Sequence, residues 1–305
     1  MKKKAIVTGG TKNMAPAMGV LALNISSICP DIADELVIYH DGISITDQNK
    51  ISSIFPTRFI LYRNPFETVN SFDEVVTKYF SPMVFSKYEC FNLLHEYSQV
   101  IWTDYDIVIL KDFSSDLFSK EESLVVIPDT EMGCLLEMFK TNISELQLSG
   151  VDLTKRGICL PLFLVRDTFP DYLRFYNKCI QLTKELSAYL YLPEQCVISV
   201  LLQRDSIKYG TLPFIPYAAH PIKHKTADEV FIIHAAGQPK FWNGLKNKDW
   251  IKYYNIWVKK HHGLRFPKYK ESKLILFIQL CKRTFKSNTI IMIIWNKLVK
   301  RGFNE

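Results

Sequence analysis

The stretch that decides the fold is Val100–Leu110, which reads VIWTDYDIVIL. A continuous apolar run of this kind is typical of a strand buried on both faces. In extended backbone, residues two apart point to the same face, so Asp104 and Asp106 are expected to converge while Tyr105 points away. Two close carboxylates repel unless a cation lies between them. The stretch therefore predicts a strand that ends in a divalent-metal site with room for phosphate oxygens.

The D-x-D pattern by itself is weak evidence for such a site. The chain has 16 aspartates in 305 residues, so roughly one match is expected by chance. Aspartate is also common at strand ends as part of turns. The apolar flanks favour the functional interpretation, because buried acids need partners. On this stretch alone, a metal site and an ordinary turn are equally good interpretations.

Strands and helices alternate along most of the chain. Strands are predicted at Lys4–Thr8 (followed by a turn at Gly9 and Gly10), Glu35–His40, Arg58–Tyr62, Gln99–Thr103, Ile107–Leu110, Leu124–Pro128, Leu160–Val165 and Val230–Ile233. Helices are predicted at Pro16–Ile28, after the N-cap Ser44, and at Val84–Glu96, Tyr172–Leu190 and Gln195–Gln203. This alternation predicts an α/β fold with a mixed, mainly parallel central sheet flanked by helices. Ligands are expected at the carboxyl ends of its strands.

A second informative stretch is Phe231–Trp242, in which a predicted strand delivers His234 to a loop. Imidazole is a good ligand for Mn²⁺, Gly237 permits close approach of a bulky anion, and Lys240 can neutralise a diphosphate. A histidine at a strand end and a surface lysine would explain each residue separately. Their occurrence in one loop, in a chain that also carries an acidic pair, favours a site for a metal and a diphosphate.

Composition excludes several classes of protein. The chain is 48% apolar and 23% charged, which suits one large globular domain or two small ones. No apolar run approaches the ~18–20 residues that span a bilayer, and the basic start Met1–Lys4 is not followed by the apolar core of a signal peptide. Seven scattered cysteines without a C-x-x-C pair argue against disulfides and structural zinc, and favour a reducing cytosol.

The net charge of +7 is concentrated at the C-terminus. Residues 259–305 hold 12 Lys/Arg and 2 Asp/Glu, whereas residues 1–258 hold 26 and 29. We therefore expect a catalytic domain at 1–258 and a basic, apolar, helical tail at 259–305, with a linker near Gly263–Lys273. Its apolar runs, Leu274–Cys281 and Ile290–Trp295, are too short to span a membrane, but they suit attachment to an anionic membrane surface. A helical hairpin packed on the domain is the alternative.

In order and spacing, the two stretches resemble the retaining glycosyltransferases of family 8, which have the GT-A fold. That family pairs a strand-end D-x-D with a later H-x-x-G-x-x-K-P-W. Here these are Asp104–Asp106 and His234–Trp242, with Phe241 in place of the proline. Softer matches are Asp41–Ser44, Ser81–Leu94 and the pair Glu194 and Gln195. The resemblance spans roughly residues 5–242.

The resemblance implies a role for each matching residue. Asp104, Asp106 and His234 would hold Mn²⁺ or Mg²⁺ on the diphosphate of a UDP-sugar. The expected nucleotide-sugar contacts are Thr8, Gly9, Lys87 (where the family usually has arginine), Asp104, Tyr105, Gly237 and Lys240. Glu194 would bind hydroxyls of the donor sugar and Gln195 would lie near its anomeric carbon, so the expected catalytic set is Gln195, Glu194 and Asp106.

The chain also departs from the family pattern. The first loop, Thr8–Met14, lacks the acid and the tyrosine that commonly hold uracil and ribose, and Lys12 is unusual there. The family's N-x-G stretch near the acceptor is replaced by Cys159–Pro161, and Cys196 replaces the acid after the glutamine. Glu194 and Gln195 are explained equally well as the first turn of a helix after Pro193, where the helix dipole favours acids.

The resulting hypothesis is a metal-dependent retaining transferase. It would move galactose or glucose from a UDP-sugar to a glycan or lipid-linked glycan in bacterial surface polysaccharide (lipopolysaccharide) synthesis, in the cytoplasm at the inner face of the cytoplasmic membrane. Alternatives are an inverting GT-A transferase, a nucleotidyltransferase, and a degenerate, non-catalytic transferase docked on membranes. Nucleic-acid binding is disfavoured, because the basic residues of the tail alternate with aliphatic rather than stacking aromatic residues.

Overall fold

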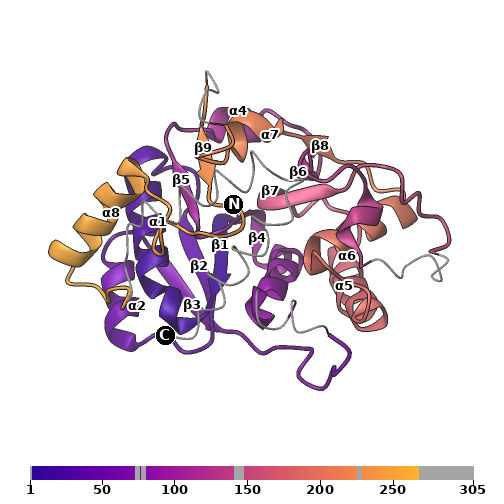
Figure 1. Cartoon of the computed structure of the whole chain (residues 1–305), viewed down its shortest axis with the longest axis horizontal. Helices are drawn as coiled ribbons and strands as arrows, with labels where there is room; N and C mark the ends of the chain where they lie inside the picture. Colours follow the sequence, from indigo (N-terminus) through magenta and orange to yellow (C-terminus); the bar gives the residue numbers. More distant parts are fainter. Residues whose placement is uncertain (1, 73–75, 77–79, 141–147, 225–228, 268–305) are drawn as a thin grey trace, which may run out of the picture.

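A seven-stranded sheet forms the centre of the molecule (Figure 1). The structure is a computed structural model that describes residues 2–72, 76, 80–140, 148–224 and 229–267. The strand order is β3-β2-β1-β4-β7-β6-β8. The strands are β1 (Lys3–Gly10), β2 (Glu35–His40), β3 (Thr57–Leu61), β4 (Tyr97–Thr103), β6 (Leu124–Pro128), β7 (Ile158–Arg166) and β8 (Gly210–Thr211).

Most strands of this sheet point in one direction. β3, β2, β1 and β4 run parallel to one another, β7 runs antiparallel between β4 and β6, and β8 is parallel to β6. The carboxyl ends of six strands therefore meet at one edge, together with the start of β7. The predicted mixed, mainly parallel α/β architecture is confirmed. The edge formed by the strand ends is where ligands bind in sheets of this kind.

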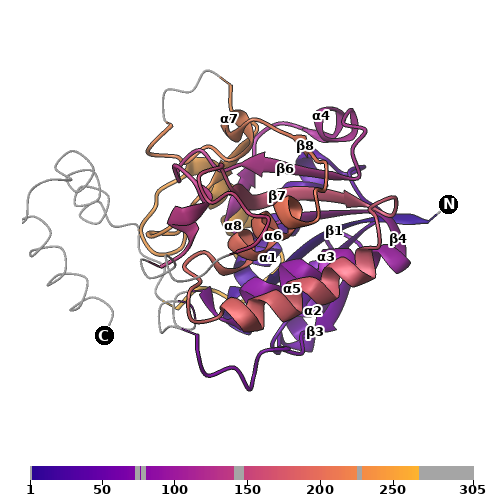
Figure 2. The same ribbon diagram turned by 90° about the vertical axis from the view of Figure 1, so that its right-hand side faces the viewer.

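Helices cover both faces of the sheet (Figures 1 and 2). One face carries α1 (Ala15–Ile28), α2 (Ile45–Ser52) and α8 (Lys248–Lys259), and the other carries α3 (Glu89–Asn92), α5 (Tyr172–Leu186) and α6 (Pro193–Arg204). The short helices α4 (Ser114–Phe118) and α7 (Phe214–Tyr217) lie beyond β6 and β8. Alternate side chains of β1 enter the two cores, Ile6 on one face and Ala5 and Val7 on the other.

A two-stranded sheet lies beside the large one. β5 (Ile107–Ile109) pairs antiparallel with β9 (Ile232–His234), with Ile107 opposite His234. The buried amide of Asn24 in α1 completes this ladder: its Nδ2 donates to the Ile109 carbonyl at 2.9 Å, and its Oδ1 accepts from the Ile109 N–H at 2.6 Å. This double hydrogen bond fixes the small sheet to α1. The pairing of β5 with β9 brings the two sequence stretches of interest into contact.

Two predicted elements differ from the structure. Gly9 and Gly10 form no turn but continue β1, because the strand passes tightly under other side chains: a Cβ on Gly9 would lie 2.1 Å from the Ser86 hydroxyl. The predicted helix Val84–Glu96 is mostly 3-10, at Pro82–Tyr88 and Leu93–His95, around the short α3. Ser86 contributes to this, since its hydroxyl donates to the Met83 carbonyl at 2.6 Å and competes with regular helix bonding.

The sequence analysis missed α8. Its N-cap is Asn247, whose side chain accepts from the N–H groups of Asp249 and Trp250. Its buried residues, Trp250, Tyr253, Tyr254 and Trp257, follow the three- and four-residue spacing of an amphipathic helix. Both signals are present in the sequence, so periodicity alone could have identified this helix.

The first residues of the predicted tail pack on the domain. The Trp257 indole N–H donates to the Leu264 carbonyl at 2.9 Å, and the Phe266 N–H donates to the Tyr254 hydroxyl at 3.0 Å. Residues 268–305, which include both apolar runs of the tail, lie outside the described residues, and the boundary after residue 258 stays a prediction. In the part of the chain that is described, no helix has the length and apolarity needed to cross a membrane.

Packing of α8 on α1 depends on Gly19, because a Cβ there would lie 2.3 Å from the Trp257 ring. We expect Gly19→Ala to lower the free energy of unfolding by about 1–3 kcal/mol, the usual cost of overpacking a core. Denaturant unfolding would measure it. The matched control is Gly133→Ala, where the added carbon meets only the flexible end of the Glu137 side chain. Equal effects of the two substitutions would contradict this account.

Candidate active site

Asp104 and Asp106 lie between β4 and β5, at the edge where the strands end. Asp104 follows β4 directly, and Asp106 lies in a turn, so the expected extended geometry is wrong. The carboxylates converge nevertheless, because hydrogen bonds fix this segment. The Asp104 N–H donates to the Pro161 carbonyl at 2.9 Å, and the Trp102 indole N–H donates to Asp104 Oδ1 at 2.8 Å. Asp106 accepts the N–H of Ala235 on its carbonyl at 3.0 Å.

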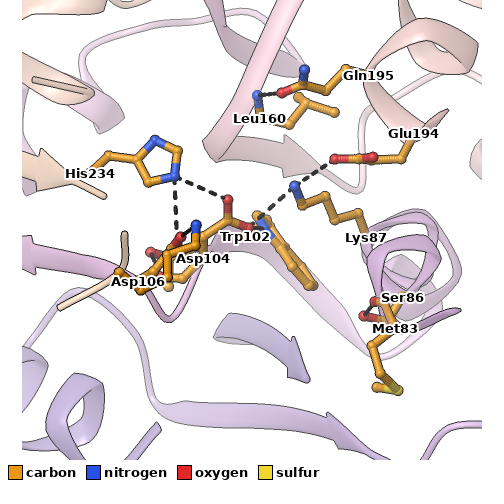
Figure 3. Close-up of polar contacts among 12 residues, drawn as sticks. Met83, Ser86, Lys87, Trp102, Asp104, Asp106, Leu160, Glu194, Gln195 and His234 are labelled. Carbon is orange, nitrogen blue, oxygen red and sulfur yellow. Dashed lines mark hydrogen bonds and ion pairs between the residues drawn. The ribbon is translucent and has the colours of Figure 1, made fainter. Parts of the chain in front are cut away.

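His234 completes a cluster with the two aspartates (Figure 3). Its Nε2 lies 3.7 Å from Asp104 Oδ2 and 3.5 Å from Asp106 Oδ1. One ligand atom from each residue lies within 4.8 Å of the other two. Two carboxylate oxygens and an imidazole nitrogen form a donor set that suits Mn²⁺ and related divalent cations. The predicted convergence of Asp104, Asp106 and His234 is therefore found, and the cluster fits a divalent metal.

Lys240 reaches the same cluster from the loop after β9. Its ammonium group donates to Asp106 Oδ2 and to the Ala235 carbonyl, the latter at 2.9 Å. Burial opposes ionisation of Asp106, but the neighbouring Lys240 ammonium and the His234 ring outweigh it and hold the pKa of this carboxyl well below its usual value. Asn243 positions the loop, because its Oδ1 accepts the Lys240 N–H at 2.6 Å. Lys240 thus serves as a counter-ion to Asp106.

Lys87 forms a second buried ion pair on the other side of Asp104. Its Nζ lies 2.7 Å from Glu194 Oε1 and 3.3 Å from Asp104 Oδ1 (Figure 3), and 5.7 Å above the Trp102 ring. Burial disfavours the charged ammonium, but Asp104 and Glu194 outweigh it, so the pKa of Lys87 lies above its usual value. The 3-10 helix at Pro82–Tyr88 directs Lys87 toward the strand ends. Lys87 therefore links the metal cluster to Glu194.

Glu194 and Gln195 lie in the first turn of α6, which begins at Pro193. The Gln195 Oε1 accepts the N–H of Leu160, at the start of β7, at 3.1 Å (Figure 3). This bond fixes the amide against the strand beside Cys159, where the sequence departs from the family pattern. Burial raises the pKa of the Cys159 thiol well above its usual value, so this group stays neutral. Glu194 and Gln195 thus take part both in the helix first turn and in the site.

Other residues expected at the nucleotide sugar occupy different surroundings. Thr8 is fully buried, and its hydroxyl has no hydrogen-bond partner among the described residues. Gly9 passes under Ser86. Tyr105 lies against Gly10 and stacks on Trp242 with ring centroids 5.9 Å apart, and burial raises the pKa of its hydroxyl. Gly237 has a φ of +75°, a conformation that favours glycine. Gly9 therefore has an evident packing role, whereas Gly237 shapes the loop of Lys240.

Sequence reasoning missed three groups that position this site. They are Trp102, which donates to Asp104; the backbone N–H of Leu160, which donates to Gln195; and Asn243, which holds Lys240. The contact of Trp102 with Asp104 could have been predicted, because Trp102 lies two residues before Asp104 at the end of the strand. The other two depend on contacts between distant segments. Together the site offers two carboxylates and an imidazole for a cation, and a lysine on each side of them.

Comparisons with known proteins bear on the fold and on part of the sequence. Residues 5–146 match the sequence profile of Glycosyl transferase family 8. The galactosyltransferase LgtC, solved with donor and acceptor sugar analogs, is similar in structure, with a TM-score of 0.63 and 12% identity over 82% of this chain and 95% of that chain. Among curated proteins, none matches the chain in sequence.

Two further solved structures share the fold. The bifunctional glycosyltransferase WbbM has a TM-score of 0.63 and 12% identity, covering 86% of this chain and 51% of that chain. The glycosyltransferase GlyE of Streptococcus pneumoniae TIGR4 has a TM-score of 0.51 and 16% identity, covering 88% and 66%. At these identities the likeness extends to the GT-A fold alone, and the profile match covers slightly less than half of the chain.

Lys240 competes with any cation for Asp106. We therefore expect Lys240→Met to raise the affinity of the donor-free protein for Mn²⁺ by roughly tenfold to a hundredfold, the worth of a hydrogen bond to a charged group. Titration calorimetry or Mn²⁺ electron paramagnetic resonance would measure it. Lys240→Arg keeps the charge and is the matched control, expected to bind Mn²⁺ as weakly as the parent protein. Unchanged or weaker binding by Lys240→Met would refute this competition.

Proposed function

We propose that this chain is a glycosyltransferase of family 8, whose sequence profile matches residues 5–146, and that it transfers a hexose from a UDP-sugar to a hydroxyl group of a glycan acceptor, with retention at the anomeric carbon. The observation that supports this most directly is the cluster of Asp104, Asp106 and His234 beside Lys240. A nucleotide sugar contains a diphosphate, which gains negative charge when it leaves the sugar. Cations beside its oxygens stabilise that charge. The proposed donor sugar is galactose or glucose.

In this proposal Asp104, Asp106 and His234 hold a divalent cation, Mn²⁺ or Mg²⁺. When bound, such an ion stabilises the negative charge that develops on the diphosphate leaving group. Trp102 and the Pro161 carbonyl keep Asp104 in place before any ligand enters. This preorganisation matters because groups that are already oriented need no rearrangement as the reaction proceeds.

Two lysines have separate parts in this proposal. Lys240 leaves Asp106 and donates to the diphosphate, and the glycine conformation at Gly237 gives the loop the shape that this approach requires. Lys87 stays with Glu194, whose second carboxylate oxygen accepts hydrogen bonds from donor-sugar hydroxyls. A buried charge needs a partner, and Lys87 and Glu194 supply one to each other at 2.7 Å.

We propose that the acceptor attacks from the face that the diphosphate leaves. The acceptor oxygen then bonds to the anomeric carbon as its bond to the phosphate oxygen breaks, and the acceptor proton passes to that phosphate oxygen. Gln195 is a poor nucleophile, and one lone pair of its amide oxygen already accepts the Leu160 N–H. Gln195 is better suited to orienting the sugar near the anomeric carbon than to forming a covalent intermediate.

An inverting mechanism is the second candidate. It needs a general base on the side opposite the leaving group, and the acid in the first turn of α6, Glu194, is already paired with Lys87. The configuration of the isolated product at the anomeric carbon distinguishes the two mechanisms. A non-catalytic role is disfavoured by the family assignment and by the complete cluster of three metal ligands.

The acceptor and the place of action complete the proposal. We propose a glycan or lipid-linked glycan acceptor, in bacterial surface polysaccharide synthesis at the inner face of the cytoplasmic membrane. The sequence of the tail supports this, because residues 268–305 combine 9 Lys/Arg with two apolar runs. Such segments bind anionic membrane surfaces through both charge and apolar contact.

Metal dependence tests the proposal most directly. With UDP-galactose or UDP-glucose as donor, we expect EDTA to abolish transfer, Mn²⁺ to restore it, and Asp106→Asn to lower kcat/KM at least a hundredfold. The matched control is Asp31→Asn, at an exposed aspartate outside the site. Hydrolysis of the UDP-sugar without acceptor supplies the assay while the acceptor is unidentified. Full activity without metal, or in the Asp106→Asn variant, would overturn the proposal.

The donor can be identified by thermal stability, because a ligand that binds only the native state raises Tm. We expect one UDP-hexose, at about 100 times its Kd, to stabilise the protein by about 2.7 kcal/mol and raise Tm by a few degrees. The rise should require Mn²⁺ and disappear in Asp106→Asn. A shift of the same size without metal would show that the nucleotide binds elsewhere.

A further inference from the structure

A hollow of about 660 Å³ opens beside the C-terminal end of α6. Its walls come from two segments, residues 150–155 and residues 202–209, and we refer to it as the α6 hollow. None of its lining residues belongs to the cluster of acids, histidine and lysines in the candidate active site. Its volume is within the range of roughly 300–1,000 Å³ that small-molecule sites have. The α6 hollow is therefore large enough for a ligand of its own.

Hydrogen bonds hold the two walls of the hollow in place. The Gln203 side chain bridges them, because its Oε1 accepts the Asp152 N–H at 2.9 Å and its Nε2 donates to the Asp152 carbonyl at 3.3 Å. Just beyond the helix, the two carboxylate oxygens of Asp205 lie 2.8 and 2.7 Å from Lys178 Nζ of α5. Walls that are already ordered lose little conformational freedom when a ligand binds, which favours binding.

The hollow has an apolar surface with an aromatic ring beside it. Leu202 is buried, and Val151 and Ile207 are partly buried and pack against the core. Tyr209 is 38% exposed, which is unusual for so large an apolar ring. An exposed tyrosine supplies a flat apolar surface with a polar tip. This combination suits a ligand that has an apolar face and a polar edge, as a sugar ring has.

Several polar groups of the hollow are available to a ligand. Among the described residues, the Tyr209 and Ser206 hydroxyls and the Lys155 ammonium form no hydrogen bond or ion pair. The Asp152 carboxylate is held through Oδ1, which accepts the Thr154 N–H at 2.9 Å and the Thr154 hydroxyl at 2.6 Å. Its other oxygen, Oδ2, can accept from a ligand. Donors and acceptors are therefore both present around the apolar surface.

The charges of the hollow indicate a neutral ligand. Its lining contains one carboxylate, Asp152, and one ammonium, Lys155, so its net charge is zero. A nucleotide or another anion is attracted by a surplus of positive charge, which this hollow lacks. Neighbouring hydroxyls of a neutral sugar can donate to the carboxylate and accept from the ammonium at once. The chemistry of the hollow thus matches a neutral carbohydrate best.

One helix connects the hollow with the candidate active site. Gln195 lies in the first turn of α6 and Gln203 in its last, eight residues apart. At 1.5 Å per residue this separation is about 12 Å along the helix axis. Figure 2 shows α6 beside β7, whose first residues follow Lys155 closely and include Cys159 near the site. A short oligosaccharide is long enough to reach from one end of α6 to the other.

We propose that the α6 hollow binds a neutral sugar residue of the acceptor glycan, a few residues away from the hydroxyl that receives the hexose. Tyr209 stacks on this sugar, and Asp152 and Lys155 bond to its hydroxyls. The proposal rests on the proposed function and deepens it, because it makes the acceptor an oligosaccharide that is selected by length as well as by its reacting end.

Binding of oligosaccharides without metal or nucleotide tests the hollow separately from the donor site. The probes are neutral oligosaccharides of two to five glucose, galactose or N-acetylglucosamine units, titrated with EDTA present and followed by saturation-transfer difference NMR. We expect the parent protein to bind at least one of them. Tyr209→Ala should weaken that binding by roughly tenfold, near the upper end of what an aromatic contact contributes. Tyr209→Trp retains a ring and should restore it.

Two further variants serve as controls. Leu173→Ala removes a side chain of α5 that is 46% exposed and lies outside the hollow, and it should bind as the parent protein does. Asp106→Asn should also bind as the parent does, because the hollow does not include the metal cluster. Absence of parent binding, equal binding by parent and Tyr209→Ala, or equal losses in Tyr209→Ala and Leu173→Ala would each overturn the proposal.

Transfer kinetics test whether the bound oligosaccharide is the acceptor. With a UDP-hexose and Mn²⁺, mass spectrometry should show the bound oligosaccharide extended by one hexose. Tyr209→Ala should raise KM for it roughly tenfold and affect kcat much less. An unextended oligosaccharide, or an unchanged KM, would overturn the assignment of the hollow to the acceptor. Absence of UDP-sugar hydrolysis in the parent protein would instead count against the proposed function, whatever the NMR titrations show.

Discussion

The repulsion between Asp104 and Asp106 is the constraint on which the rest of the site depends. Two carboxylates that share a mostly buried edge of the sheet must each find positive charge or hydrogen-bond donors. Asp104 receives the Trp102 indole N–H and lies 3.3 Å from Lys87, while Asp106 receives Lys240, and His234 faces both. These partners come from three segments of the chain: β4, the 3-10 helix at Pro82–Tyr88, and β9 with the loop after it. The need of the Asp104 and Asp106 carboxylates for positive charge and hydrogen-bond donors therefore brings together the ends of β4 and β9 and the 3-10 helix.

The lysines that neutralise the acids differ in how they are held. Lys87 is buried, with carboxylates of two residues around it, so removing Lys87 would leave the buried Glu194 carboxylate without its counter-ion, which costs more than the pair itself contributes. Lys240 lies on a loop and pairs with one carboxylate and one carbonyl. A buried cation and a loop-borne cation on the two sides of the Asp104–Asp106–His234 cluster suit a reaction in which one wall of the site is permanent and the other responds to the ligand.

The sequence was sufficient for the features that depend on local pattern. The alternation of apolar strands and amphipathic helices predicts the sheet, and the D-x-D and the histidine loop predict the cluster. The misassigned elements are those in which a distant contact overrides the local signal. Gly9 and Gly10 resemble a turn but extend a strand, because Ser86 and Tyr105 leave no space for side chains there. Val84–Glu96 has helical periodicity, yet the Ser86 hydroxyl bonds to the Met83 carbonyl, and the segment is mostly 3-10. The contact between Gln195 and the Leu160 N–H joins residues 35 apart, and no local pattern encodes it.

Phe241, which stands where the motif of glycosyltransferase family 8 has proline, changes how the loop of Lys240 is held in place. A proline at this position would fix the backbone by its ring, whereas Phe241 is buried and stacks on Trp250 of α8. Its neighbour Trp242 stacks on Phe266, with ring centroids 5.1 Å apart and an angle of 11° between the planes. Trp242 also stacks on Tyr105, the residue between Asp104 and Asp106 in the sequence. The loop of Lys240 is thus held by aromatic contacts with α8 and with the segment after it. Stacked aromatic rings stabilise a fixed arrangement beyond the area that they bury. In this chain the geometry of the loop of Lys240 depends on α8 and on Phe266, so a displacement of that segment has a direct packing route to the cation beside Asp106.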